Sequence, residues 1–456
     1  MLKAIAASLT FLLLTAEIPA QTFISGADLS YVNTILEKGG VYRDASGNVT
    51  DPYRLFADKG ASMVRIRLWH TPQNITDKCG NPIEANDLDD VVLAFQRAKS
   101  NGMKRMLAIH YGDYFNDPDK QKMPAAWMGL SHSVLIDSVH RYTSAVLARL
   151  LAENVVPDVV AIGNETTWEF IDETASTQGW TWPEDADKFN AGFDAVDEFN
   201  AANGQQVKKA VHFTQSTALW LAGLFKSQQI TNFDILGFSF YPMWADISTM
   251  QALGNLIQQL KTVSGKEIMV FETGAPWTLQ NSDTYSNFMN NYGDFSYPVN
   301  AQGQKDFLYD LAETVYENGG TGIIYWEPAW ITSSMCDAWG RGSSYENVGF
   351  FDFNNNNTPL PAFDFFGYCR YLSVESHPSG SGSVRIYPNP AKSHCSILGL
   401  LQPTQIIITD SKGNILRREV VQDSLIDLSG LPDGVYYLTL RQDGKSITRQ
   451  LVKQSN

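Results

Sequence analysis

The sequence predicts an α/β fold, a (β/α)8 TIM barrel, followed by a small antiparallel β-sandwich-like domain. Eight short apolar runs alternate with segments of helical pattern over about 350 residues, which is the repeat of such a barrel. Polar and aromatic residues collect where these runs end, and in a parallel barrel those ends meet at one mouth. After Leu372 the helical pattern stops, and short strand-like runs separated by turns begin.

Each expected barrel strand is a run of apolar residues, as a strand buried on both faces requires. The runs cover residues 23–29, 62–69, 104–109, 159–165, 209–213, 234–241, 267–272 and 322–327. Helical spacing is clearest in 52–58, 88–100 and 133–154, and 118–127 is expected to be a polar loop. Pro52 suits the first turn of its helix, and Asp87 is a suitable N-cap for the next one.

The two ends of the chain indicate export and a second domain. Residues 1–20 have one early lysine, a short apolar run and a small residue before Gln21, which is the pattern of a signal peptide. The run is too short to span a bilayer, so no transmembrane span is expected. The barrel is then assigned to 21–372, a Ser- and Gly-containing linker to 373–383, and the β domain to 384–456, with strands near 384–387, 405–409, 436–441 and 447–452.

Composition narrows the class of partner. The net charge of -15 and the pI of about 4.9 argue against nucleic acid and favour a neutral substrate over a polyanion. Aromatic residues make up 12% of the chain, which fits either a large core or platforms for sugar rings.

The chain has four cysteines: Cys79, Cys336, Cys369 and Cys395. None of them is in a C-x-x-C pair, so they give no support for a zinc site, and their disulfide pairing stays open.

Two of the predicted strands end in a glutamate, and this pair is the candidate catalytic site. Glu165 follows Gly163-Asn164 at the end of strand four, and Glu272 ends strand seven. Hydrolysis of a glycosidic bond needs two carboxyl groups that flank it, one protonated and one ionised. Asn164 is placed to hold a substrate hydroxyl. A single glutamate at a strand end is more often a salt-bridge partner, but two of them in matching positions favour catalysis.

Other strand ends supply candidate partners for these carboxyl groups. Arg67, His110 and Tyr241 are expected to donate hydrogen bonds to an ionised Glu272, and Trp326 is expected to stack on a sugar face. Taken singly, each of these residues has a structural explanation, as a salt-bridge partner or part of the core. Glu327 is either a third acid or a buried structural partner.

Motifs found in order over residues 23–366 are similar to those of glycoside hydrolase family 53, the arabinogalactan endo-β-1,4-galactanases (EC 3.2.1.89). The most specific run is Tyr325-Trp326-Glu327-Pro328-Ala329-Trp330; the others include Val64-Arg65-Ile66-Arg67-Leu68-Trp69, His110-Tyr111-Gly112-Asp113, Gly163-Asn164-Glu165 and Gly237-Phe238-Ser239-Phe240-Tyr241-Pro242. The resemblance implies a retaining double displacement, with Glu165 as acid/base and Glu272 as nucleophile. It also implies substrate binding by Arg67, His110, Asp113, Asn164, Tyr241, Trp244 and Trp326.

The chain departs from the family pattern near the expected cleft. Gly112 and Phe115 replace a Ser and a Trp, a long segment from Thr166 to Thr181 follows Glu165, and Ala245-Asp246 replaces His-Gly. These changes leave subsite preference, product length and tolerance of arabinose branches open. The resemblance implies no required cofactor. It admits calcium as an optional ligand near Asp283 and Asn287.

The tail resembles the C-terminal sorting domain of type IX secretion substrates, through Tyr387-Pro388-Asn389-Pro390 and Gly434-Val435-Tyr436-Tyr437. The alternative is a small carbohydrate-binding module. The resemblance implies the type IX machinery as a partner and a secreted or cell-surface location, reached across the periplasm of a Gram-negative bacterium.

The function expected from the sequence is therefore a secreted, monomeric endo-β-1,4-galactanase that acts on β-1,4-galactan. The enzyme alternative is another β-glycanase of the same clan, such as a mannanase or xylanase. The alternative of a different class is a polysaccharide-binding surface protein without catalysis, against which the presence of both glutamates argues.

Overall fold

The computed structural model describes residues 23–173, 179–374, 385–398, 404–421, 425–442 and 445–454. The chain divides after Val374 into two compact units, each treated separately below. The predicted signal peptide, residues 1–20, lies outside the described residues. So does the predicted linker from residue 375 onward, whereas Ser373 and Val374 belong to the last helix of the first unit.

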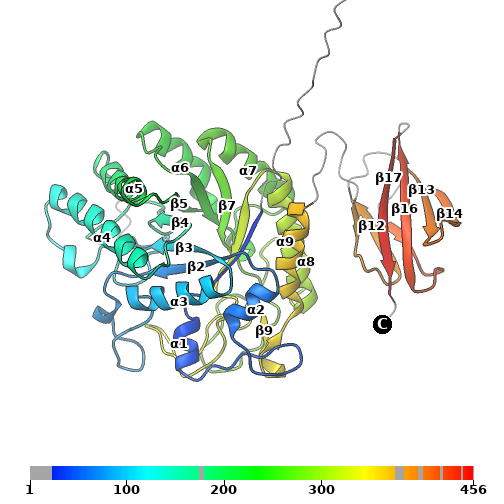
Figure 1. Cartoon of the computed structure of the whole chain (residues 1–456), viewed down its shortest axis with the longest axis horizontal. Coiled ribbons are helices and arrows are strands. Elements are labelled where there is room, and N and C mark those ends of the chain that lie inside the picture. The colour runs from blue at the N-terminus through cyan, green and yellow to red at the C-terminus, as the bar shows by residue number, and fades with distance from the viewer. Residues whose placement is uncertain are drawn as a thin grey trace, which may run out of the picture. The chain divides into compact units, whose positions relative to one another are not determined.

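The first unit is a closed barrel of eight parallel strands, as predicted, in which each strand pairs with the next along the chain and the eighth pairs with the first (Figure 1). The strands are β1 Ile24–Asp28, β2 Met63–Leu68, β3 Lys104–Ile109, β4 Val159–Ile162, β5 Lys208–Thr214, β6 Ile235–Ser239, β7 Glu267–Glu272 and β8 Gly322–Tyr325. Several strands end one to three residues before the predicted limits, because the polar residues at their ends turn into the loops of the barrel mouth.

Helices surround the barrel (Figure 1). They are α1 Val32–Glu37, α2 Pro52–Asp58, α3 Leu88–Ser100, α4 His132–Ala152, α5 Glu184–Asn203, α6 Gln215–Ser227, α7 Met250–Ser264, α8 Ala301–Glu317 and α9 Asp364–Val374. The predicted caps are present: Pro52 opens α2, and the Asp87 side chain accepts from the Asp90 N–H at the start of α3.

Short elements complete this unit. Strands β9 Phe351–Asp352 and β10 Thr358–Pro359 form a two-stranded sheet. Single 3-10 turns lie at η1 Pro72–Asn74, η2 Ala125–Trp127, η3 Pro242–Trp244, η4 Phe353–Asn355 and η5 Pro361–Phe363. The turn η2 lies inside the segment 118–127, which the sequence predicts as loop.

The barrel interior is packed with side chains, and this determines where the charged residues of β2 lie. Met63, Arg65 and Arg67 alternate along β2, so all three point inward, and all three are buried. Met63 belongs to an apolar interior cluster with Phe271, which lies against Gly237 so closely that a Cβ there would be 2.0 Å from the ring. The two arginines lie above this apolar layer, toward the mouth.

The second unit is a sandwich of two antiparallel sheets, as predicted. One sheet has the order β11 Arg385–Tyr387, β12 His394–Leu398, β15 Leu425–Asp427. The other has the order β14 Ile415–Val421, β13 Thr404–Asp410, β16 Gly434–Gln442, β17 Lys445–Lys453. Cys395, Ile408, Leu438 and Leu451 belong to the core between the sheets.

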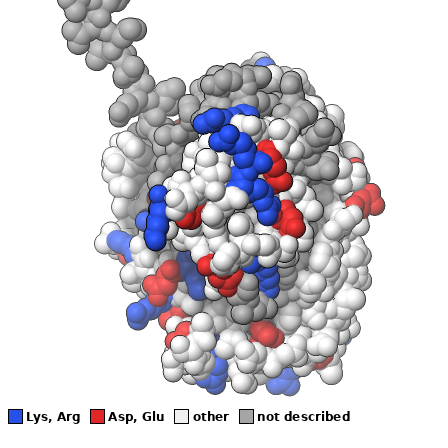
Figure 2. All heavy atoms as spheres, turned by 90° about the vertical axis from the view of Figure 1, so that its right-hand side faces the viewer, with Lys and Arg blue, Asp and Glu red and all other residues white. Residues whose placement is uncertain are grey.

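The two units differ in charge. Residues 385–456 hold nine Lys and Arg against six Asp and Glu, so the whole acidic excess of the chain lies before them. Figure 2 faces the second unit and shows basic side chains gathered in a line across it. Arg418 and Arg441 are among the exposed basic residues of its larger sheet.

A disulfide joins Cys79 in the loop after β2 to Cys336 in the loop after β8, with a Cα–Cα distance of 6.2 Å. Cys369 and Cys395 are buried free thiols, one in each unit. Within the described ranges, no helix has the length and apolarity to cross a bilayer.

Candidate active site

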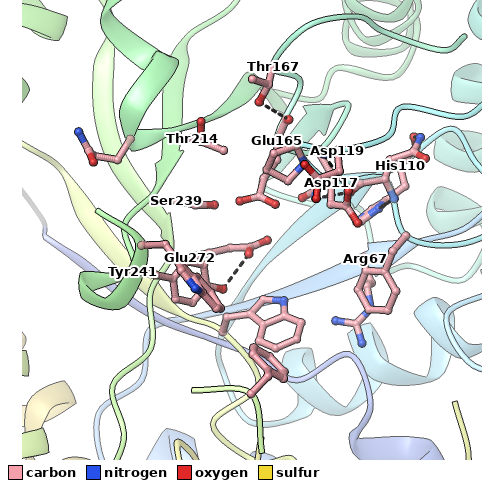
Figure 3. A pocket seen from close by; sticks show the side chains of 18 of the residues that line it. Arg67, His110, Asp117, Asp119, Glu165, Thr167, Thr214, Ser239, Tyr241 and Glu272 are labelled. Carbon is pink, nitrogen blue, oxygen red and sulfur yellow. Dashed lines mark hydrogen bonds between the residues drawn. The ribbon is translucent and has the colours of Figure 1, made fainter. Parts of the chain in front are cut away.

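A cleft of about 850 Å³ opens at the C-terminal mouth of the barrel. Its floor is formed by residues at strand ends, and its walls by the loops that follow (Figure 3). The lining brings together eight of the nine residues predicted for catalysis and substrate binding: Arg67, His110, Asn164, Glu165, Tyr241, Trp244, Glu272 and Trp326. Asp113 is the one predicted binding residue that is not part of this lining.

The two glutamates face each other across the cleft. Glu272 is the last residue of β7, and Glu165 follows β4 after a tight turn. Gly163 has a φ of 84° in that turn, and a Cβ there would lie 2.8 Å from Thr166 and 2.9 Å from Phe170, so glycine is needed. Figure 3 shows the carboxyl groups of Glu165 and Glu272 pointing toward one another.

Glu272 is held by one cation and one hydroxyl. Arg65 Nη2 lies 2.8 Å from its Oε1, and the Tyr241 hydroxyl donates to its Oε2 at 2.9 Å. Burial raises the pKa of Glu272, whereas the Arg65 guanidinium and the Tyr241 hydrogen bond act in the opposite direction. Of the two glutamates, Glu272 is therefore the one whose carboxylate form is stabilised by a cation and a hydrogen-bond donor.

Arg65 itself is fixed by three acceptors. Besides Glu272, its guanidinium is paired with Asp28 at the end of β1 and donates to Asn164 Oδ1 at 2.7 Å. Asn164 Nδ2 donates to the carbonyl of Asn116 at 2.9 Å, which sets the orientation of its amide. One buried guanidinium thus links the nucleophile candidate to the residue before the acid/base candidate.

Arg67 does not bind Glu272, contrary to the sequence-based expectation. Its Nη2 lies 2.7 Å from Glu327 Oε1, and both side chains are fully buried. Arg67 is the arginine nearer the mouth, and its partner is the glutamate that follows the end of β8. Glu327 is therefore the buried structural partner of the two alternatives, and its burial raises its pKa to about 8 while Arg67 opposes the rise.

Glu165 has no ion pair among the described residues, in contrast to Glu272. Burial and the nearby charge of Glu272 raise the pKa of Glu165 well above its usual value. Ser239 lies within hydrogen-bonding reach of its carboxyl group. The proton that the pair shares is therefore held mainly by Glu165.

His212 connects Ser239 to Asn164. Its Nδ1 lies 3.0 Å from Asn164 Oδ1, and its Nε2 lies 2.9 Å from Ser239 Oγ. The amide oxygen only accepts, so Nδ1 carries the proton and Nε2 accepts from the Ser239 hydroxyl. The serine oxygen is left to accept a hydrogen bond from the O–H of the neutral Glu165 carboxyl group. Burial and Arg65 lower the pKa of His212 well below its usual value, so the ring stays neutral.

His110 is a hydrogen-bond donor aimed into the cleft. The Asn116 N–H donates to its Nδ1 at 3.1 Å, so the ring proton lies on Nε2, which has no partner within the described chain. Burial, with Arg65 and Arg67, lowers the pKa of His110 well below its usual value. A neutral imidazole with a free N–H suits a sugar hydroxyl, and it does not contact Glu272 as the sequence reasoning expects.

Aromatic rings form the walls of the cleft. Trp326 packs edge-on against Tyr345 with ring centroids 4.7 Å apart. Trp244 is about half exposed and stacks on Phe288 at 6.0 Å. Phe115 packs against Trp339, which is also about half exposed and lines the cleft. Exposed, braced indoles at a cleft are suited to stacking on sugar rings.

Two expectations find no support in the geometry. The Asp113 carboxylate accepts hydrogen bonds from Asn74 Nδ2 and the Ala125 N–H. It therefore connects the loops after β2 and β3 and does not line the cleft. The suggested calcium residues are also committed to protein partners: Asp283 accepts from Tyr285, Thr332 and Ser343, and Asn287 donates to Asn281. No group of three His, Cys, Asp or Glu that suits a metal occurs in the described ranges.

Sequence reasoning missed four residues of the site: Asp28, Arg65, His212 and Ser239. All four lie on predicted strands and are polar in otherwise apolar runs. That signal marks a side chain directed into the barrel, but it does not say which partner the side chain meets.

Comparisons with known proteins show which families the two units resemble. Residues 24–366 match the family described as Glycosyl hydrolase family 53, and residues 385–454 match the Secretion system C-terminal sorting domain. The arabinogalactan endo-beta-1,4-galactanase of Cellvibrio japonicus is 38% identical over 349 residues, 75% of this chain and 90% of that protein. The endo-beta-1,4-galactanase of Bacillus subtilis is 32% identical over 387 residues, 76% and 86% of the two chains. The solved GH53 catalytic domain of Ignisphaera aggregans is 30% identical with a TM-score of 0.68, covering 78% of this chain and 98% of that one.

Proposed function

The chain belongs to glycosyl hydrolase family 53, and on that basis we propose that it cleaves β-1,4-galactan internally and with retention, using Glu165 as acid/base and Glu272 as nucleophile. It is a secreted endo-β-1,4-galactanase. The observation that supports the division of roles is the unequal treatment of the two carboxyl groups: Arg65 and Tyr241 bind Glu272, whereas Glu165 has no cation among its described partners.

The first step forms a covalent intermediate. Neutral Glu165 gives its proton to the glycosidic oxygen, and the Glu272 carboxylate attacks the anomeric carbon. The bond from that carbon to the glycosidic oxygen breaks, and the leaving chain departs as an alcohol. Arg65 and Tyr241 stay bound to Glu272, which keeps the attacking oxygen in position.

The second step returns the enzyme to its starting state. Glu165, now ionised, removes a proton from water, and the oxygen of that water attacks the anomeric carbon. The ester bond to Glu272 breaks, and the product has the β configuration of the substrate. The free Nε2–H of His110 and the amide of Asn164 are the polar groups proposed to orient the sugar hydroxyls.

Reducing-sugar release from linear β-1,4-galactan by the wild type, Glu165→Ala and Glu272→Ala tests this proposal. Both variants are expected to lose about 10³-fold or more of the rate. Proton NMR of the first product should show the β anomer. Release of mannose or xylose oligomers from other glycans, with none from galactan, would favour the alternative β-glycanase. Galactan binding without hydrolysis would favour the binding protein.

Secretion or display at the cell surface by the type IX system follows from the sorting domain. We further propose that the route crosses the periplasm of a Gram-negative cell and that the exported enzyme is a monomer without a required cofactor. Light scattering of the purified chain measures its oligomeric state. Full activity after treatment with EDTA is expected, and a loss that calcium restores would overturn the last point.

A further inference from the structure

A second groove of about 830 Å³ lies on the outside of the barrel, between α6 and α7. Helix α6 contributes Trp220, Gly223 and Ser227, and α7 contributes Asn255, Gln259 and Thr262. None of the described residues that line it is charged, although charged residues make up 18% of the chain and concentrate on its surface. A groove on a helical surface without charge suits a neutral, hydroxyl-rich ligand better than an ionic one.

Trp220 provides a flat platform at one side of this groove. Its side chain is 48% exposed, on a helix whose other large residues, such as Leu221 and Phe225, are buried. An indole combines a broad apolar face with a polar N–H, which matches the apolar and polar faces of a pyranose ring. About half of this residue stays exposed although Trp168 packs against its ring, so part of the indole is left for a ligand to bind.

Gly223 keeps the groove open beside this platform. It lies in the middle of α6 with ordinary helical geometry, and a Cβ at this position would meet nothing within 4 Å. Packing therefore does not require glycine there, and glycine lowers the stability of a helix by about 1 kcal/mol relative to alanine. The missing side chain leaves free space one turn after Trp220, where a ligand can approach the helix.

The opposite wall offers hydrogen-bonding groups. The Gln259 side chain has no hydrogen-bond partner in the described part of the chain, and it is exposed. Asn255 accepts from Gln251 through Oδ1, which leaves its Nδ2 group for another acceptor. The Thr262 hydroxyl donates to the Gln258 carbonyl, so its oxygen is available as an acceptor. These groups can both donate to and accept from hydroxyl groups.

The groove connects with the catalytic cleft through a pair of indoles. Trp168 comes three residues after Glu165, is 43% exposed and lines the cleft. Its ring packs against Trp220, with centroids 5.5 Å apart. Helix α6 also begins in the cleft, where Gln215, Ser216 and Thr217 line the wall. A chain that leaves the cleft over Trp168 therefore meets Trp220, which also lines the outer groove.

We propose that the groove between α6 and α7 is an auxiliary binding site for a segment of the β-1,4-galactan chain, entered over the Trp168–Trp220 pair. This inference rests on the proposed function for the identity of the ligand. The site holds a part of the polymer far from the bond that is cleaved. It should therefore matter for long chains and not for oligosaccharides that the cleft alone accommodates.

The test uses two groove variants in the full chain. Trp220→Ala removes the platform, and Gly223→Gln fills the open space without a clash and with a better helix former, so it should fold at least as well as the wild type. Leu93→Ala, which removes an exposed apolar side chain from α3, is the matched control. Kinetics are measured on linear galactan and on galactotetraose.

Both groove variants should lower kcat/KM on the polymer about tenfold, mainly through KM, and change kcat/KM on galactotetraose by less than about twofold. Leu93→Ala should leave both substrates unaffected. Binding alone is measured with the inactive Glu272→Ala variant, whose migration in a native gel that contains galactan should be retarded. Adding Trp220→Ala or Gly223→Gln to this variant should reduce the retardation. If the wild type is active and the groove variants have the same ratio of polymer to tetraose activity as the wild type, the auxiliary site is overturned and the proposed function stands. A wild type inert on both substrates would overturn the proposed function and this ligand with it.

Discussion

Arg65 Nη2 lies 2.8 Å from Glu272 Oε1, and the same guanidinium is paired with Asp28 and donates to Asn164. All of these side chains are buried. An arginine has five N–H donors in a fixed plane, so it can serve three acceptors at once and hold their relative positions. Arg65 therefore contributes both to the charge of the proposed nucleophile and to the position of the residue before the acid/base.

Replacement of Arg65 by lysine tests whether the geometry of the guanidinium matters in addition to its charge. The charge remains, but a lysine ammonium cannot reproduce the planar fork toward Asp28, Asn164 and Glu272. We expect kcat/KM on galactan to fall about 10²-fold or more. The pKa of Glu272 should rise as its cation becomes less well placed, so the acidic limb of the pH profile should move to higher pH. Arg67→Lys is the control, and an equal shift of the acidic limb there would contradict the assignment.

The alkaline limb of the pH profile should belong to Glu165. Its pKa is raised by burial and by Glu272, and hydrolysis needs its protonated form, so kcat/KM should fall as pH rises through that raised pKa. Glu165→Ala should lose the alkaline limb when assayed with an aryl galactoside whose leaving group needs no proton. Persistence of the limb in this variant would assign it to another group.

Glu327 should make the barrel less stable as pH rises. Its pKa is about 8 in the folded chain, above the value of about 4.3 for an unfolded glutamate. Between these values the folded chain holds a proton that the unfolded chain releases, so stability is highest near the lower pH and declines toward the higher one. All 11 tryptophans precede residue 340, so tryptophan fluorescence in urea reports on the barrel.

Glu327→Gln tests that contribution. The variant should show a flatter dependence of the unfolding midpoint on pH between about 5 and 8. Near pH 8, where Glu327 is partly ionised, Arg67→Met should be less stable than the wild type by about 3–5 kcal/mol, because the buried carboxylate is left without its cation. The double variant Arg67→Met/Glu327→Gln should recover part of that loss. Additive losses would show that the two side chains are not coupled.

The disulfide between Cys79 and Cys336 should support both stability and substrate binding. It closes a loop of 257 residues, so its removal should cost about 2–5 kcal/mol. Cys336 precedes Asp337, whose carboxylate holds the Trp339 N–H and the Tyr285 hydroxyl at the cleft wall. Cys79→Ser/Cys336→Ser should therefore raise KM more than it lowers kcat. Dithiothreitol should affect the wild type in the same direction and leave the double variant unchanged.

Removal of the second unit should leave catalysis intact. The two units have separate apolar cores, and α9 completes the first with buried Cys369 and Leu372. A chain that ends at Val374 has a complete barrel core, so its kcat/KM on galactan should stay within about twofold of the wild type. It should no longer be exported, because it lacks the sorting domain. A chain that ends at Phe366, where the family match stops, should unfold at lower temperature. Equal melting temperatures would show that α9 contributes nothing.

The sequence was sufficient for the barrel strands and for the glutamate pair, because both depend on local patterns. A buried run that ends abruptly in Gly-Asn-Glu gives the strand, its end and the carboxylate together. The partner of each arginine could not be predicted. Arg65 and Arg67 have the same parity on β2, and only the tilt and stagger of the closed barrel decide which of them reaches Glu272.

The other misses have the same physical origin. The tail strands β12, β14 and β15 were not predicted. They are short or, like Ile415–Val421, mostly exposed with three charged residues in a row, so little apolar alternation marks them. The Cys79–Cys336 pairing joins loops that follow different strands and meet only when the barrel closes. Asp113 looks like a cleft residue in its motif, but its carboxylate is turned toward Asn74 and Ala125.

The placement of both arginines on one strand has a consequence for folding errors. A shift of β2 by one residue would turn Arg65 and Arg67 outward and bring Val64 and Ile66 into the barrel. Asp28, Glu272 and Glu327 would then be buried as three acids without a counter-charge, an arrangement far less stable than the native one. The charged residues of the active site thus also disfavour a shifted register of β2. A barrel closed in the wrong register would lack both stability and activity.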